Sequence, residues 1–366
     1  MIECPKTRFV SELESLTPSF SESAIMHEKF AFLWRYLQRF TAVSNGGDII
    51  LIVGPSNSGK SQLLALLTRH LRENLFAAVE PGHLPIIGAK ANPSRDSRMT
   101  PKQVALALLA DGGHVLYDPE RREKTGFYPS MKASSEDLLH THLSELVFRR
   151  AVRYVIVDEG QLITRSKDKL FAATLLESLK SMAGSNRNLV VCGGYDLLEP
   201  ALALRSHVAV RTIVLHLAPY EPETGLLEWR RILKTMSKSE KLNGLGRFLN
   251  DSALQLLTES HGCVGVLERR LKDSLAWSAA HGLPLDERMF VERRPIRLQW
   301  EAQRNDIEQG KAQLAQVEWG ATEHGEVFLV TAAEAGAPSS SQKPGIRRTK
   351  KLKPFQSRPN RFPAAR

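Results

Sequence analysis

Long apolar runs are missing from this sequence, which has 366 residues and a hydrophobic content of 42%. Because a transmembrane helix needs about 20 mostly apolar residues in a row, we expect no membrane span. Cysteine is scarce: Cys4, Cys192 and Cys263 lie far apart and outside any C-x-x-C pair. This argues against a disulfide framework or a zinc site and fits a reducing cytoplasm. The eleven histidines form no metal-ligand pattern, and residues 1–16 lack the apolar stretch of a signal peptide.

Acidic residues are absent after Glu334, where nine Lys and Arg side chains account for most of the net charge of +10. The body of the chain is therefore close to neutral. The same region is rich in Pro, Ser and Gly, so we expect residues 338–366 to form a disordered basic tail. Such a tail binds a polyanion or a protein partner, or it only keeps the protein soluble.

A phosphate-binding motif is present early in the chain. Residues 54–61 follow the pattern G-x-x-x-x-G-K-S, between an apolar strand (48–53) and a helix with leucines at helical spacing. The small residues let consecutive backbone N–H groups point inward, and with the helix dipole these donors form an anion site. We predict that Lys60 reaches the β- and γ-phosphates of ATP and that Ser61 binds Mg²⁺. The predicted nucleotide contacts are Gly54, Pro55, Ser56, Asn57, Ser58, Gly59, Lys60, Ser61 and Gln62.

A pair of acids at the end of a second buried strand supplies the other half of the expected site. The apolar residues 154–157 lead directly into Asp158 and Glu159. We predict that Asp158 holds the Mg²⁺ shell and that Glu159 polarises the attacking water. The strand at 188–194 is expected to lie between these two strands in space. At its exit, Tyr195 and Asp196 either sense the γ-phosphate or cap the next helix.

Strands and helices alternate along residues 25–218, including a helix expected at 169–183. This predicts an α/β nucleotide-binding core with a parallel sheet between layers of helices. From Pro219 onward the pattern is helical alone, which predicts a helical lid over residues 219–290. The remaining expected parts are an N-terminal extension (1–24), a helix at 296–316 within a linker region (291–337), and the tail.

The strand order, the Walker-type loop, the acid pair and the helical lid together resemble an AAA+ P-loop ATPase. The lid segment LLTESHGCVGVLERRLKDSLAWSAAHGLPLD is similar to the S/T-x-G-x-x-G-x-L…A…G pattern of the TniB/TnsC family of transposon-encoded AAA+ regulators. The strand ends IVDEGQLI and VVCGGYDLL match patterns of the same family, and the resemblance spans about residues 25–285. It implies ATP-dependent oligomerisation, as a ring or helical filament, on double-stranded DNA. The implied partners are a transposase and target-selector proteins, in a bacterial cytoplasm near the nucleoid, with hydrolysis disassembling the complex.

The resemblance also implies residues that contact neighbours. In AAA+ rings an arginine of the adjacent subunit stabilises the charge of the transferring phosphoryl group, and Arg205 and Arg211 lie in the region expected for it. Family members touch the DNA backbone with the loop after the second strand of the core. Arg95, Arg98 and Lys102 occupy that loop and the following helix start. Contacts of this kind go to phosphate and carry little sequence information.

The lid departs from the usual AAA+ pattern at one point. It has Gly265 and Val266 where many AAA+ proteins place an arginine. Either Arg269 or Arg270, one turn further on, takes this place, or the lid does not touch phosphate. Arg269 is our predicted nucleotide contact.

Two other classes of function remain open at this stage. One is a signalling NTPase switch that binds protein partners and no DNA, and its ATPase activity would be indifferent to DNA. The other is a helicase or replication loader such as an IstB-like protein, which would bind a replicative helicase. The sequence has no transposase-like acidic triad, so we do not expect this chain to cut DNA itself.

Overall fold

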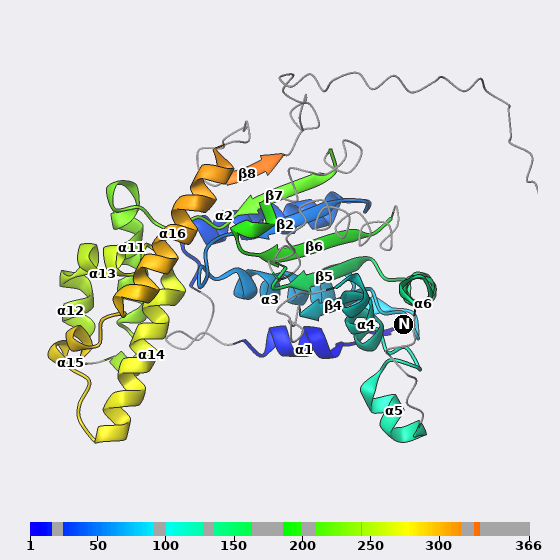
Figure 1. Cartoon of the computed structure of the whole chain (residues 1–366), viewed down its shortest axis with the longest axis horizontal. Coiled ribbons are helices and arrows are strands. Elements are labelled where there is room, and N and C mark those ends of the chain that lie inside the picture. The colour runs from blue at the N-terminus through cyan, green and yellow to red at the C-terminus, as the bar shows by residue number, and fades with distance from the viewer. Residues whose placement is uncertain are drawn as a thin grey trace, which may run out of the picture. The chain divides into compact units, whose positions relative to one another are not determined.

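Six strands form the central sheet of the computed structural model (Figure 1). The first five in spatial order are parallel, and the sixth pairs antiparallel to β7. Side by side across the sheet, the strands are β4 (Ile86–Lys90), β5 (Tyr154–Asp158), β6 (Asn188–Gly193), β2 (Ile49–Val53), β7 (Thr212–His216) and β8 (Glu326–Leu329). The predicted position of β6 between β2 and β5 is confirmed.

The described residues are 1–16, 25–90, 100–126, 135–160, 162, 186–198, 210–242, 244–315 and 326–329. They all belong to one compact unit, Met1–Ala335. The helix expected at 169–183 and the tail at 338–366 lie outside the described residues.

Alternation of side chains along the strands builds two cores, one on each face of the sheet, because successive residues of a strand point to opposite faces. In β2, Leu51 and Val53 contribute to one core, whereas Ile50 and Ile52 contribute to the other. All five residues of β2 are buried, as expected for a parallel strand that is covered on both faces. The predicted parallel sheet between layers of helices is therefore confirmed.

Helices cover both faces of the sheet. The first face packs against α1 (Arg8–Glu14), α2 (Glu28–Val43) and α3 (Lys60–His70), which continues as the π-helical turn η1 (Leu71–Leu75). The second face packs against α4 (Pro101–Asp111) and α6 (Glu136–Arg149). The short helix α5 (Pro119–Thr125) connects these two in the chain, and the 3-10 turn η2 (Tyr195–Leu197) follows β6.

A separate apolar cluster holds the lid together, with Trp229 and Phe290 at its centre. Its elements are α11 (Pro222–Met236), η3 (Glu240–Leu242), α12 (Gly246–Asp251), α13 (Ala253–Glu259), α14 (Val264–His281) and α15 (Glu287–Glu292). Among the described helices, none combines the length and the hydropathy that crossing a bilayer requires.

After the lid the chain returns to the core. Helix α16 (Arg297–Leu314) runs from the lid toward the sheet, and β8 then pairs with β7 (Figure 1). The helix was expected, but the strand was not, because the sequence pattern assigned residues 291–337 to a helix and linker. Residues 326–329 form a strand because β7 at the edge of the sheet supplies backbone partners, which no local sequence pattern indicates.

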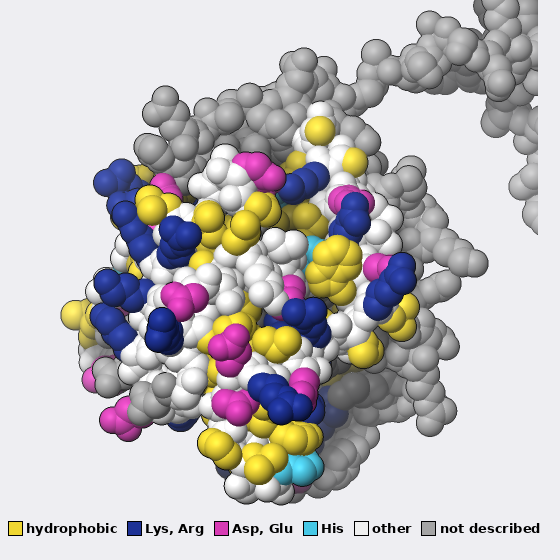
Figure 2. Space-filling view, turned by 90° about the vertical axis from the view of Figure 1, so that its left-hand side faces the viewer, with side chains coloured by type: hydrophobic (Ala, Val, Ile, Leu, Met, Phe, Trp, Pro, Cys, Tyr) yellow, Lys and Arg dark blue, Asp and Glu magenta, His cyan; other side chains and the backbone are white. Residues whose placement is uncertain are grey.

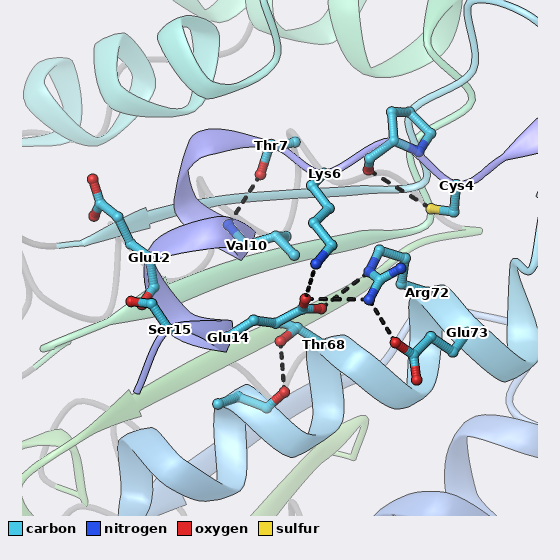
Figure 3. Close-up of polar contacts among 12 residues, drawn as sticks. Cys4, Lys6, Thr7, Val10, Glu12, Glu14, Ser15, Thr68, Arg72 and Glu73 are labelled. Carbon is cyan, nitrogen blue, oxygen red and sulfur yellow. Dashed lines mark hydrogen bonds and ion pairs between the residues drawn. The ribbon is translucent and has the colours of Figure 1, made fainter. Parts of the chain in front are cut away.

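The N-terminal segment packs on the core. Strand β1 (Ile2–Glu3) pairs with β3 (Ala78–Val79), and α1 contacts α3 and β4. Figure 3 shows the polar contacts of this segment: Glu14 accepts hydrogen bonds from Lys6 Nζ at 2.8 Å and from Arg72 Nε at 3.0 Å. Burial acts to raise the pKa of Glu14, but these bonds from Arg72 and Lys6 outweigh it, and the pKa lies below its usual range. The two cations thus hold the carboxylate charged against the core.

Asp111 also holds the N-terminal segment against the core. Its Oδ1 accepts from Phe9 N–H and its Oδ2 from Gly88 N–H, both at 2.8 Å. The ring of Phe9 lies directly over Gly88, where a Cβ atom would come within 2.0 Å of it. Burial raises the pKa of Asp111 to about 6, although the two N–H donors oppose the shift.

This geometry predicts a pH-dependent stability. Since the folded pKa of Asp111 is raised above the unfolded value, its contribution is greatest below pH 4 and is lost as the pH rises to about 6. The difference amounts to on the order of 3 kcal/mol. We expect the unfolding free energy of wild type, relative to Asp111→Asn, to fall by this amount between pH 4 and pH 7. Urea unfolding of both proteins across this range measures it, and a constant difference would show that Asp111 titrates normally.

Candidate nucleotide-binding site

The loop between β2 and α3 has the backbone conformation of a phosphate-binding loop. Asn57 and Gly59 have positive φ angles of 60° and 103°, and α3 begins directly after Gly59. A Cβ atom at Gly54 would lie 2.7 Å from the carbonyl oxygen of Leu217, so only glycine fits there. The turn therefore depends on both glycines of the motif, at its start and before its lysine.

The side chains of the loop lie ready for an anion. Lys60 Nζ donates to the carbonyl oxygens of Gly54 at 3.0 Å and Pro55 at 2.7 Å. The buried hydroxyl of Ser58 has no hydrogen-bond partner among the described residues. Buried polar atoms are normally paired. An unpaired hydroxyl in this loop can therefore donate a hydrogen bond to an oxygen of a bound anion.

Asp158 and Glu159 end β5 beside this loop. Ser61 Oγ donates to Asp158 Oδ2 at 3.3 Å, and the backbone N–H of Glu159 donates to Asp158 Oδ1 at 2.9 Å. Glu159 has a φ of 58°, a conformation that is uncommon outside glycine and that turns the chain sharply at the strand end. The structure therefore brings together the predicted metal pair and the predicted base.

The electrostatics of Asp158 suit a cation. Burial raises its pKa, and the neighbouring charge of Glu159 adds to this, while the N–H of Glu159 opposes it. A divalent cation would reverse the penalty by supplying the missing positive charge. A serine hydroxyl and a carboxylate are the hard oxygen ligands that Mg²⁺ prefers, with water and phosphate completing its shell. Ser61 and Asp158 thus fit Mg²⁺.

Of the two residues predicted to contact the nucleotide after β6, only one lines the cleft. Asp196 is exposed and lines the cleft with Gly193 and Gly194. Tyr195 does not: its side chain is buried, its hydroxyl lies 2.9 Å from His216 Nε2, and its ring packs against Gly310. The prediction that Tyr195 contacts phosphate is therefore not supported, because the tyrosine has a hydrogen-bond partner and an apolar surface inside the core.

The lid touches the phosphate-binding loop through a glycine. Gly265 N–H donates to the carbonyl oxygen of Asn57 at 3.0 Å, and a Cβ atom at Gly265 would lie 2.5 Å from that oxygen. This close approach explains why a large residue is absent where many AAA+ proteins have an arginine. Of the two alternatives one turn on, Arg270 is buried and engaged with Glu259 and Phe290. Arg269 is exposed and lines the cleft, as predicted for a nucleotide contact.

Comparison with known proteins agrees with this geometry. Residues 43–199 match the family model of the AAA domain. The ORC2 protein of Aeropyrum pernix, in its ADPNP-ADP complexes, superposes with a TM-score of 0.50 at 17% identity over 79% of this chain and 71% of that chain. The chain has the AAA+ P-loop fold.

Two further structures are more distant. The ADP form of Aeropyrum pernix ORC2 gives a TM-score of 0.48 at 19% identity, covering 79% of this chain and 72% of that one. Domain III of the replication initiation protein DnaA from Thermotoga maritima gives 0.41 at 15% identity, covering 76% and 96%. No curated protein matches the chain.

The wall of the AAA+ cleft beside the loop comes from the start of α2. Ile25, His27 and Phe30 line it together with Val264 of the lid. His27 Nδ1 accepts hydrogen bonds from Tyr220 O–H at 2.8 Å and from Phe30 N–H at 3.4 Å. Burial, with a smaller effect of Lys29, lowers the pKa of His27 to about 4, so its ring is neutral at pH 7. This wall is apolar and uncharged, and the sequence reading did not find it.

Helix α16 also contributes side chains that sequence reasoning missed. Gln303 Nε2 donates to the carbonyl oxygen of Ser56 at 3.5 Å, and Asp306 lines the cleft below it. Trp300 stacks on His261 of the lid at a ring-centroid distance of 4.4 Å. One signal for this placement was present: Gly310 lies inside a helix of otherwise good helix formers, which often marks a close packing contact.

The residues predicted to contact neighbours lie apart from the cleft or outside the described residues. Arg211 is exposed just before β7, and β7 begins beside Ile49, whereas the phosphate-binding loop follows Val53. Arg211 is thus roughly 15 Å along the strands from the loop of its own chain. Lys102 is half-exposed in the first turn of α4. The other three, Arg95, Arg98 and Arg205, lie outside the described residues.

Charge on the lid face is mixed. Lys and Arg side chains are interspersed with Asp and Glu side chains over the visible, described part of this face (Figure 2). Several are ion pairs, such as Arg293 with Asp273 at 2.8 Å. The described lid face therefore presents no broad positive surface of the kind that DNA phosphates attract.

The Gly265 contact yields a prediction about the lid. In Gly265→Val the new side chain collides with Asn57, so the lid must move away from the loop, and we expect nucleotide affinity to fall roughly tenfold. Calorimetric titration with ADP measures the change. The matched control is Gly246→Val, because a Cβ at Gly246 meets nothing closer than 3.9 Å. Equal affinities in the two variants would mean that the lid contact does not shape the site.

Proposed function

We propose that this chain is an ATPase whose cleft binds ATP with Mg²⁺ and hydrolyses it. One observation carries the proposal: Ser61 and Asp158 lie 3.3 Å apart at the base of the phosphate-binding loop, with Glu159 next to them on the cleft wall. A loop for phosphates, a pair for the cation and a base for water make up what phosphoryl transfer to water requires.

Binding begins with the loop. Its backbone N–H groups and the N-terminus of α3 attract the phosphates. Lys60 already lies against the loop through the carbonyl oxygens of Gly54 and Pro55, so it needs only a side-chain rotation to reach a phosphate oxygen. The neutral wall of Ile25, His27 and Phe30 suits an uncharged base. The cleft volume of about 1460 Å³ leaves room for a whole nucleotide.

Hydrolysis needs water to be oriented and its proton accepted. Glu159 lines the cleft directly after Asp158, and we assign its carboxylate the role of holding a water and taking its proton. When bound, Mg²⁺ held by Ser61 and Asp158 would neutralise phosphate charge. The strained backbone of Glu159 fixes its direction relative to Asp158.

Subunits share the site in this proposal. Because Arg211 is exposed at the opposite end of the strands from its own phosphate-binding loop, a nucleotide that it contacts would belong to a neighbouring chain. Arg205 has the same proposed role. An arginine supplied in this way stabilises the negative charge of the transition state, so hydrolysis depends on assembly.

We further propose that the ATPase acts as a timer for a DNA-bound transposition regulator of the TniB/TnsC kind. Support comes from the lid pattern on which that resemblance rests, since its glycine, Gly265, makes the contact with the phosphate-binding loop. The proposed partners are double-stranded DNA, contacted by Arg95, Arg98 and Lys102, a transposase, and target-selector proteins. Domain boundaries at residues 25, 219, 291 and 338, and a location near the bacterial nucleoid, belong to the same proposal.

The role of Glu159 gives the first test. We expect Glu159→Gln to bind ATP with near-normal affinity and to hydrolyse it at least a hundredfold more slowly, because the amide keeps the shape but accepts no proton. Phosphate release and nucleotide binding measure the two effects separately. Lys60→Ala is the companion variant, and it should lose binding itself because the charge on the phosphates is gone.

DNA association extends this test to the wider proposal. With ATP and duplex DNA, Glu159→Gln should form longer-lived assemblies than wild type in electron micrographs, whereas Lys60→Ala should form none. If wild type hydrolyses ATP but DNA changes neither its rate nor its assembly, a signalling switch replaces the DNA-bound regulator. Capture of a replicative helicase would instead favour the loader.

Sharing of the site gives a second test. Arg211→Ala should lower hydrolysis without unfolding, and mixing it with Lys60→Ala should restore part of the activity. In the mixture, an intact loop from one chain meets an intact arginine from the other. Circular dichroism checks folding, and cross-linking checks co-assembly. Intact co-assembly without any recovery would rule out Arg211 as the shared arginine and leave Arg205 to be tested in the same way.

A further inference from the structure

Helix α16 lies across the mouth of the nucleotide cleft and is fastened at three points. Gly310 packs against the Tyr195 ring of the core, Trp300 stacks on His261 of the lid, and Lys311 pairs with Glu221 at the start of α11. The same lid residue also contacts the backbone of α16, because His261 Nε2 lies 2.9 Å from the carbonyl oxygen of Trp300. The helix therefore bridges core and lid directly over the phosphate-binding loop.

The side chains that α16 directs into the cleft do not resemble those of a phosphate site. Gln303 contacts the loop at Ser56, and Asp306 contributes a carboxylate to a wall that already carries Asp196. Burial raises the pKa of Asp306, the charge of Asp196 raises it further, and Lys60 opposes the shift. Asp306 thus feels both the lysine that should hold phosphate and a second carboxylate.

The charges on the cleft wall indicate how Asp306 acts on a nucleotide phosphate. Both carboxylates and cations line the cleft, among them the carboxylates of Asp158, Glu159, Asp196 and Asp306 and the cation of Lys60. Asp158 and Glu159 have roles with Mg²⁺ and water in the proposed reaction, whereas Asp306 has none. A phosphate chain that enters beside Lys60 meets Asp306 of the same cleft lining as a like charge, and the repulsion between like charges grows as they approach.

We propose that Asp306 is an affinity-determining residue of this nucleotide site: its carboxylate offsets the charge of Lys60 and opposes the entry of nucleotide phosphates, so that nucleotide binding and the packing of α16 on the core compete. Nucleotide occupancy then controls the position of α16. The inference rests on the proposed nucleotide site and adds an element that lies outside the AAA domain match.

The direct test removes the charge. We expect Asp306→Asn to tighten ADP binding about fivefold or more in the presence of Mg²⁺, measured by calorimetric titration of the full chain. The matched control is Glu308→Gln on the same helix, which makes the same change of charge at an exposed side chain paired with Arg304. The control should bind ADP as wild type does. Equal or weaker binding in Asp306→Asn would overturn the inference.

A second variant acts through packing and leaves every charge in place. A Cβ atom at Gly310 would lie 2.2 Å from the Tyr195 ring, so Gly310→Ala must lift α16 from the core, while alanine favours the helix itself. We expect tighter ADP binding and faster hydrogen exchange across residues 297–314. In wild type, ADP alone should accelerate exchange in the same residues. Slower exchange with ADP, or weaker binding in Gly310→Ala, would mean that α16 supports the nucleotide and would contradict the competition.

The outcomes separate the inference from the function beneath it. If wild type binds ADP and the Asp306 variant is unchanged, the inference fails and the nucleotide site stands. If neither wild type nor any α16 variant binds ADP or ATP at millimolar concentration, the proposed nucleotide site fails and the inference fails with it.

Discussion

The pairing of β6 with both β2 and β5 is the constraint on which the whole site depends. It sets the register so that Val53 lies opposite Gly193 and Val157 lies opposite Val191. Because the strands are parallel, the phosphate-binding loop and the acid pair leave the sheet at the same edge. The 3.3 Å contact between Ser61 and Asp158 follows from this register, although 97 residues separate the two in the chain.

The phosphate-binding loop and the acid pair were largely predictable, because the sequence patterns that indicate them are local. The motif combines an all-apolar strand, two glycines that the turn requires and a lysine before a leucine-rich helix, and few structures other than a phosphate-binding loop fit this combination. Asp158 could be predicted because it stands directly at the end of a buried strand. The prediction failed where residues distant in the sequence determine the orientation of a side chain. Tyr195 could face the cleft or the core, and His216 and Gly310, neither of them close in sequence, decide for the core. The strand β8 and the N-terminal packing through Asp111 were missed for the same reason.

Both segments that flank the AAA domain match are built into the fold. On one side, α1 is held to the core by two contacts: Glu14 pairs with Arg72 of the core, and the N–H of Phe9 donates to Asp111 of the core. On the other, α16 contacts the loop through Gln303 and the core through Gly310. The first set of contacts lies away from the cleft and stabilises the sheet. The second lies on the cleft, so it can respond to what the cleft holds.

The two sets of contacts differ in the free-energy cost of breaking them, and this difference indicates which segment can move. Separating α1 from the core would remove the N–H of Phe9 from the buried carboxylate of Asp111 and would part Glu14 from Arg72, and a buried polar group left without its partner costs about 1–3 kcal/mol. Lifting α16 breaks the 3.5 Å amide contact of Gln303, the packing of Gly310 on the Tyr195 ring, the contacts of Trp300 with His261 and an exposed ion pair. It also relieves the repulsion between Asp196 and Asp306. A nucleotide with several negative charges therefore meets the loop and sheet on one side and, on the other, a helix whose Asp306 repels it. In the proposed competition, α16 is the element that binding energy displaces.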